Sequence, residues 1–143
     1  MTAGVEETVT RYLALCDVPT RGDGDLGDLF TEDAVWEGGG DAYAEKFGRT
    51  EGRTAIVAML AEYLPPHPHF RANVHLLFPG TVDTDGTTAR GSWPMQQLSR
   101  YESGSAEVMV ARLDVTFRLD DDHPRISAFR TERLFCAPLT EER

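Results

Sequence analysis

The sequence has very little lysine, and this scarcity narrows the range of possible partners. Lys46 is the only lysine among 14 lysine and arginine residues, and the 143-residue chain has a formal net charge of −10. Proteins bind nucleic acids and anionic membranes through clusters of lysine and arginine that face the phosphates. We therefore expect neither a nucleic acid nor a membrane as a partner.

Cysteines and long apolar runs are equally scarce. Cys16 and Cys136 lie far apart, and neither belongs to a metal-binding spacing or a disulfide framework. No apolar run approaches the length of a bilayer span, and the first residues lack a signal-peptide pattern. The sequence therefore favours a soluble, cytoplasmic protein with two free thiols.

Motifs for an organic cofactor or a metal are also missing. Three glycines at 38–40 follow a predicted strand, but they do not open a helix in the pattern of a phosphate-binding loop. His67, His69 and His75 have no acidic residue at a spacing that would complete a metal site. We expect no cofactor and no metal.

The apolar pattern predicts a single α+β domain over residues 1–143, a length that can enclose one core. Helices are expected at residues 3–17, 26–30 and 52–64. A first strand at 34–37 leads into an irregular segment at 38–47, which forms either a flap or a strand pair at a rim. Two long strands between residues 70 and 98 share a hairpin tip at 83–86, and strands at 106–119 and 125–136 complete the chain. This order predicts a strongly curved antiparallel sheet with helices on one face.

Three polar residues interrupt or border these apolar patterns. Tyr12 lies on the apolar stripe of the first helix, Asp17 lies at its end, and His75 lies in the middle of an apolar strand. A histidine in such a strand is either a hydrogen-bonded core residue or a residue that faces a cavity. The aspartate either caps the following turn or points into the interior.

Four segments of the sequence carry a resemblance to a known family. They are RYLALCD at 11–17, GDGDL at 22–26 leading into LFTEDAVW at 29–36, GRTAI at 52–56 and VDTDGTTA at 82–89. In this order they resemble the nuclear transport factor two-like superfamily, and its SnoaL-like branch in particular. The resemblance implies a cone in which a curled sheet and about three helices enclose a deep apolar pocket. It also implies a homodimer, because members commonly pair through the sheet.

The resemblance also implies a site, although members of this superfamily differ in function. Its dehydratases use an acid at the end of the first helix, a histidine on the strand after the third helix and a tyrosine. Asp17, His75 and Tyr12 match these positions, and the tyrosine precedes the acid by five residues as in the bile-acid dehydratases. The second histidine of scytalone dehydratase is replaced here, and Trp93 is the candidate replacement.

These three residues predict acid–base chemistry on a hydrophobic, oxygenated substrate such as a polyketide or a steroid-like compound. Asp17 would orient the imidazole of His75, which would remove a proton next to a carbonyl group. Tyr12 would donate a hydrogen bond to the developing enolate. Return of the proton to a departing hydroxyl would complete a dehydration, and the same pair could enolise a substrate for ring closure.

Further residues are predicted to bind the substrate in the pocket. They are Trp36, Phe47, Met59, Tyr63, Trp93, Met95, Arg112 and Arg130. The alternative for both arginines is a cross-strand ion pair on an outer or interface face of the sheet, which we favour.

Three other functions remain open at this stage. A non-catalytic protein could use the same pocket to hold a lipophile. A ketosteroid-isomerase-like enzyme would need Glu37 to substitute for an aspartate, since Gly38 stands where those isomerases carry it. An epoxide hydrolase would need an Asp-Arg-Asp arrangement, of which only Asp114 and Arg112 are evident.

Overall fold

The computed structural model describes residues 4–64, 69–120 and 122–140, which form a curled sheet with helices on its inner face. The helices are α1 (Val5–Cys16), α2 (Gly40–Lys46) and α3 (Arg53–Ala61), with a short 3-10 helix, η1 (Leu26–Leu29). The strands are β1 (Phe30–Gly39), β2 (Arg49–Glu51), β3 (Phe70–Leu77), β4 (Thr81–Asp85), β5 (Thr88–Tyr101), β6 (Ala106–Arg118) and β7 (Arg125–Leu139). No helix in these three stretches is long and apolar enough to cross a bilayer.

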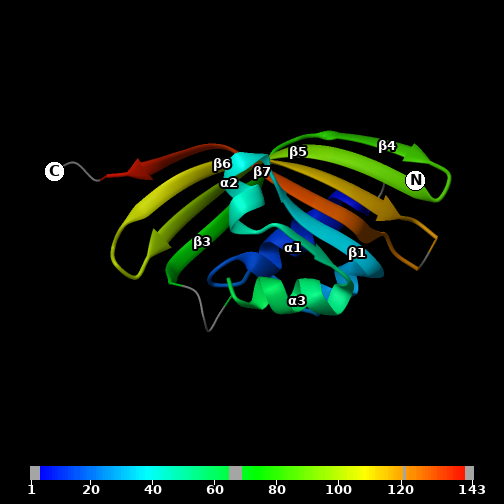
Figure 1. Ribbon diagram of the computed structural model, residues 1–143, viewed down its shortest axis with the longest axis horizontal. Coiled ribbons are helices and arrows are strands. Elements are labelled where there is room, and N and C mark those ends of the chain that lie inside the picture. Colours follow the sequence, from blue (N-terminus) through cyan, green and yellow to red (C-terminus); the bar gives the residue numbers. More distant parts are fainter. Residues whose placement is uncertain (1–3, 65–68, 121, 141–143) are drawn as a thin grey trace.

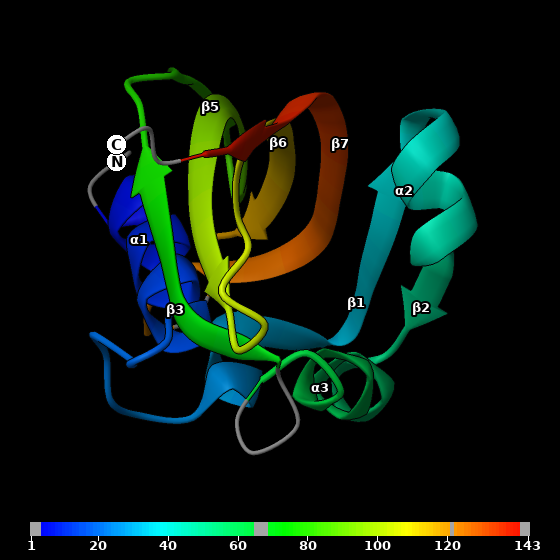
Figure 2. The ribbon, with the colours of Figure 1, turned by 90° about the vertical axis from the view of Figure 1, so that its left-hand side faces the viewer.

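The strands form one sheet in the order β2-β1-β7-β6-β5-β3, and β4 pairs with the half of β5 that β3 leaves open. Figure 1 shows α1 and α3 under the arch of this sheet. In Figure 2 the strands curl around a common interior, with α1 at one side and α3 below it. The expected α+β cone with about three helices is therefore confirmed.

The interior of the cone is filled by the apolar stripes that the sequence predicts. Val5, Val9 and Leu13 of α1 are buried with Tyr12, as their helical spacing requires. In β6, Leu113 and its inward neighbours are buried, whereas the alternate residues face outward because side chains in a strand alternate between its two faces. The core therefore lies on the concave side.

Two expectations about the strands are wrong. The sheet is mixed rather than antiparallel, because β1 pairs with β7 in parallel. The long strand expected before the 83–86 tip is two strands, β3 and β4, separated at residues 78–80. Pro79 has no backbone N–H to donate to β5, and a Cβ on Gly80 would lie 2.1 Å from the carbonyl oxygen of Ser92. The hairpin itself is confirmed by the pairing of β4 with β5, but its turn lies at residues 86–87, because residues 83–85 still pair with β5.

The segment at 38–47 is not an irregular flap. Residues Gly40–Lys46 form α2, and a positive φ of 67° at Gly40 lets the chain turn from β1 directly into this helix. Tyr43 of α2 is buried, and its ring packs edge-on against Phe47 at 5.0 Å. α2 itself packs against β1 and β7, at the rim of the cone.

Candidate active site

A cavity of about 140 Å³ lies between α1, the end of α3 and the concave faces of β3, β5, β6 and β7. Six of the residues predicted for the site line it: Tyr12, Trp36, Phe47, Tyr63, His75 and Met95. Most of its wall is apolar, as the sequence predicts. The polar groups in the wall therefore stand out as candidates for chemistry.

Asp17 and His75 meet at the wall of this cavity. One carboxylate oxygen of Asp17 lies 2.7 Å from Nδ1 of His75 and accepts a second hydrogen bond, of 3.0 Å, from the backbone N–H of His75. Asp17 is 1% exposed and His75 is 9% exposed. The two groups are therefore joined where little water can reach them.

The backbone around Asp17 explains why these two residues meet. Asp17 ends α1, and Val18 forms an isolated antiparallel bridge with Asn73 in β3 through hydrogen bonds of 2.9 and 2.8 Å. Since Asn73 precedes His75 by two residues, both side chains share one face of β3. The bridge thus holds the end of α1 against the strand that carries the histidine.

Arg21 completes the surroundings of the carboxylate and was not anticipated from the sequence. Its guanidinium pairs with the second oxygen of Asp17 and donates a hydrogen bond of 3.3 Å to the carbonyl oxygen of His75. Burial favours a higher pKa for Asp17, but the hydrogen bonds from His75 and Arg21 outweigh it and lower the pKa below its ordinary value. Asp17 is therefore an anion that holds the proton of His75 on Nδ1.

The other nitrogen of His75, Nε2, has no hydrogen-bond partner among the described residues, and His75 lines the cavity. In the neutral form of an imidazole, a proton on Nδ1 that a carboxylate holds leaves Nε2 as the basic nitrogen. This arrangement can remove a proton from a molecule in the cavity.

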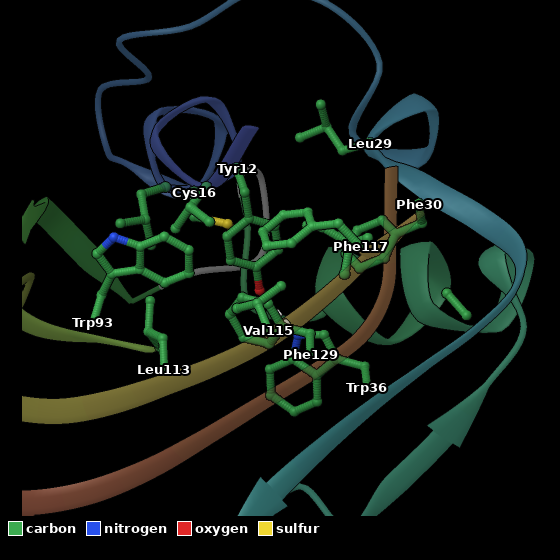
Figure 3. Packing of buried hydrophobic residues seen from close by; sticks show 14 of the residues in the cluster. Tyr12, Cys16, Leu29, Phe30, Trp36, Trp93, Leu113, Val115, Phe117 and Phe129 are labelled. Atoms are coloured by element: carbon green, nitrogen blue, oxygen red, sulfur yellow. Dashed lines mark hydrogen bonds between the residues drawn. The ribbon is translucent and has the colours of Figure 1, made fainter. Parts of the chain in front are cut away.

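Tyr12 also lines the cavity, and its hydroxyl accepts a hydrogen bond of 3.0 Å from Nε1 of Trp36. Figure 3 shows this hydroxyl between the side chains of α1 and those of the sheet, with Cys16 beside the tyrosine ring. Burial and the neighbouring Cys16 raise the pKa of Tyr12 well above its ordinary value. The hydroxyl therefore keeps its proton and can donate it in a hydrogen bond.

Cys16 also lines the cavity, between Tyr12 and Asp17 in the sequence. Burial raises the pKa of its thiol to about 12, and the charge of Asp17 contributes to the increase. Because the thiolate is the nucleophilic form of cysteine, Cys16 is inert at neutral pH.

A polar cluster beside His75 was also missed from the sequence. Asn73, Gln97 and Ser99 hydrogen-bond to one another, and the first two line the cavity. The strand period places Asn73 on the face of His75, so this residue could have been found. Gln97 could not, because its place opposite His75 depends on the register between β3 and β5.

Two predicted substrate contacts belong to the packed core instead. Trp93 is 1% exposed and packs edge-on against Phe117, one inward position before the part of β5 that lines the cavity. Met59 packs against the core, whereas Leu60, Tyr63 and Leu64 provide the cavity wall at this end of α3.

The two predicted arginines lie on the convex face of the sheet. Arg112 and Arg130 alternate with Leu113 and Phe129, which line the cavity, so their side chains point the opposite way. Arg130 lies 3.7 Å from Glu37 and 3.8 Å from Glu132. The ion-pair alternative is therefore confirmed for Arg130, and the prediction of a substrate contact is wrong for both arginines.

The same alternation weakens two of the other functions considered. Glu37 points away from the cavity because its neighbour Trp36 lines it, and Asp114 points away because Leu113 does. The isomerase that would use Glu37 and the epoxide hydrolase that would use Asp114 thus lack their acids in this cavity.

Comparison with known proteins identifies the family. Residues 2–130 match the SnoaL-like domain. The chain belongs to this SnoaL-like family. No curated protein matches it.

Solved structures share the fold of this SnoaL-like chain. Hexachlorocyclohexane dehydrochlorinase LinA type 2 has a TM-score of 0.79 at 16% identity, over 96% of this chain and 88% of its own. A Novosphingobium aromaticivorans protein with the provisional name scytalone dehydratase has a TM-score of 0.77 at 18% identity, over 97% and 87%. A nuclear transport factor 2-like superfamily protein of Salmonella enterica has a TM-score of 0.70 at 16% identity, over 92% and 89%. At these identities the likeness establishes the nuclear transport factor 2-like fold, and the function has to be argued from the site.

Proposed function

We propose that this SnoaL-like chain is a cofactor-independent enzyme that removes a proton next to a carbonyl group and expels water from a hydrophobic, oxygenated substrate. One observation carries the proposal: a buried carboxylate holds Nδ1 of His75 at 2.7 Å, and His75 lines an apolar cavity with no described partner for its other ring nitrogen. A protein that only stores a lipophile gains nothing from a buried carboxylate of this kind, because burying a charge is costly.

The reaction follows from the geometry of the pair. Nε2 of His75 takes the proton from the carbon next to the carbonyl, and the electrons of that C–H bond form an enolate. The imidazolium that results is stabilised by the anionic Asp17, whose pKa is lowered by the same contacts. As the enolate collapses to a carbon–carbon double bond, the C–O bond at the next carbon breaks and His75 returns its proton to the departing hydroxyl. The products are an unsaturated carbonyl compound and one water molecule.

Tyr12 is suited to stabilise the enolate. Its hydroxyl keeps its proton, and the hydrogen bond that it accepts from Trp36 fixes the oxygen at the cavity wall. A donor fixed in a site of low polarity stabilises a developing negative charge more than water does, since it needs no reorientation.

The test uses two bicyclic ketones. In deuterium oxide, we expect the protein to speed exchange of the protons next to the carbonyl of α-tetralone, which reports enolisation alone. With β-hydroxy-α-tetralone, we expect loss of water and tautomerisation to α-naphthol, followed by its ultraviolet absorption.

A His75→Ala variant should do neither, and this is the control for solvent-catalysed reaction. Exchange without elimination would leave a cyclase or an isomerase as the better account. Tight binding of both ketones with neither exchange nor elimination would refute the enzyme and support a lipophile carrier of the same fold. The homodimer and the cytoplasmic location expected from the sequence stay predictions.

A further inference from the structure

The polar cluster of Asn73, Gln97 and Ser99 contains hydrogen-bonding groups that do not bond within the cluster. Oδ1 of Asn73 accepts hydrogen bonds from Oγ of Ser99 at 2.7 Å and from Nε2 of Gln97 at 2.9 Å. Nε2 of Gln97 also lies 3.3 Å from Oγ of Ser99. These bonds use the carbonyl of one amide and the amino group of the other, so each amide keeps one functional group unused.

The unused groups are Nδ2 of Asn73, a donor, and Oε1 of Gln97, an acceptor. Neither has a hydrogen-bond partner within the described stretches of the chain, and both residues line the cavity. Asn73 is only 3% exposed, so little bulk solvent is available to pair with its free donor. Turning both amides around would exchange donor and acceptor between the two residues, but one of each would still face the cavity.

The position of this pair relative to His75 is fixed by the sheet. Gln97 of β5 is the direct antiparallel partner of His75 in β3, and Asn73 lies two residues before His75 on the same face. Directly opposite residues in neighbouring strands have their Cβ atoms about 4.5–5.5 Å apart. The donor and the acceptor therefore flank the imidazole that is proposed to act as the base.

We infer that Asn73 and Gln97 form a subsite for a hydroxyl group of the substrate. A hydroxyl donates one hydrogen bond and accepts others, which matches one acceptor and one donor side by side, whereas a carbonyl could use only the donor. The inference rests on the proposed function in one respect, the naming of this hydroxyl as the one that leaves. The substrate class is then a β-hydroxy ketone or a related β-hydroxy carbonyl compound.

The subsite has a defined role in the elimination. Asn73 donates to the hydroxyl oxygen, and Gln97 accepts the hydroxyl proton. When the C–O bond breaks, its electron pair stays on oxygen, and the hydrogen bond from Asn73 stabilises this charge until His75 delivers its proton. Asn73 thus acts on the leaving group, while Tyr12 acts on the carbonyl.

Binding tests the subsite without turnover. In a His75→Gln background, which cannot consume the probe, α-tetralone and β-hydroxy-α-tetralone are titrated by calorimetry. We expect the hydroxylated ketone to bind about tenfold more tightly, the effect of one or two added hydrogen bonds.

Two variants and one control locate the effect. Asn73→Asp keeps the acceptor for Ser99 and Gln97 but replaces the free donor, and Gln97→Leu removes the free acceptor from a half-buried position. Each should reduce the preference to about twofold or less. Ser99→Ala is the matched control, because Ser99 belongs to the cluster but does not line the cavity, and it should keep the preference.

The outcomes separate the subsite from the proposed reaction. Equal affinity for both ketones, a preference that survives both cavity-facing variants, or a preference lost equally in Ser99→Ala would overturn the subsite. If Asn73→Asp does not fold, Gln97→Leu alone decides. A preference with this pattern, in a protein whose wild type shows no exchange or dehydration, would support the subsite and refute the reaction.

Discussion

The interior of the cone has a filled half and a hollow half, although the same elements build both. In the filled half, Trp93 of β5 packs against Phe117 of β6, and neither is more than 1% exposed. In the hollow half, the next inward residues of β5 are Met95 and Gln97, and both line the cavity. The change from core to cavity thus takes place over a single two-residue step of one strand.

The difference between the halves lies in side-chain volume and in polarity. The indole of Trp93 lies over Gly91, where a Cβ would come within 2.1 Å of the ring, so a residue without a side chain makes room for one with a large side chain. The hollow half instead contains charged and amide groups that need hydrogen-bond partners. Packing therefore stabilises one half, and the other is free to position reactive groups.

The largest expected effect is a loss of catalytic rate from substitutions in the hollow half. His75→Ala and Asp17→Asn should each lower the rate of exchange and of dehydration by about 10²–10⁴-fold, because the first removes the base and the second removes the charge that orients it. Steady-state kinetics on β-hydroxy-α-tetralone measures this loss. Circular dichroism should show an unchanged fold, since the amide oxygen introduced by Asp17→Asn can still accept the backbone N–H of His75. A rate close to that of the wild type in both variants would contradict the assignment.

The filled half should respond in the opposite way. Phe117→Ala leaves a void under Trp93 and should lower the free energy of unfolding by about 3–5 kcal/mol. Urea denaturation measures this change. At a temperature where the variant is still folded, its turnover should stay within a few-fold of the wild type, because Phe117 does not line the cavity. A selective loss of turnover in this variant would show that the two halves are coupled.

Tyr12 lies where the halves meet, so Tyr12→Phe should affect both properties. Loss of the hydroxyl removes the proposed enolate donor, with an expected rate decrease of about 10²–10³-fold. It also leaves Nε1 of Trp36 without its acceptor, which should cost about 1–3 kcal/mol of stability. Paired kinetics and urea denaturation would distinguish these effects. A stability loss with an unchanged rate would make Tyr12 a structural residue only.

Much of the filled half could be predicted from sequence, because it depends on local periodicity. The α1 stripe and the alternation in β6 follow directly from 3.6- and 2-residue periods. Period does not determine strand direction, so the parallel pairing of β1 with β7 was missed. The seven-residue helix α2 was not predicted, because three glycines at its start disfavour a helix. Its aromatic residue, Tyr43, packs against Phe47.

The hollow half was harder to predict, because its geometry depends on contacts between distant segments. The positions of Asp17 and His75 on a family pattern were enough to propose that they meet. Arg21 reaches Asp17 only because the chain reverses after α1, where the N–H of Arg21 donates to the carbonyl of Ala14. Both placements stayed open for the arginines of β6 and β7, because the sequence does not show which face of a strand is concave.

The smallest expected effect concerns the contribution of the hollow half to stability. The pKa of Asp17 is lower in the folded protein than its ordinary value of 3.8. Its ionised form therefore stabilises the fold in full above that ordinary value, and this contribution is lost as the pH falls through the lowered folded pKa. The Asp17→Asn variant has no carboxylate at this position and therefore lacks this pH-dependent contribution. The difference in free energy of unfolding between wild type and variant should shrink as the pH decreases. Urea denaturation of both proteins between about pH 6 and pH 3 measures it, with Asp85→Asn, at the exposed end of β4, as the control. A difference that stays constant over this range would mean that Asp17 is not held as an anion by His75 and Arg21, and the base would then lack its orienting charge.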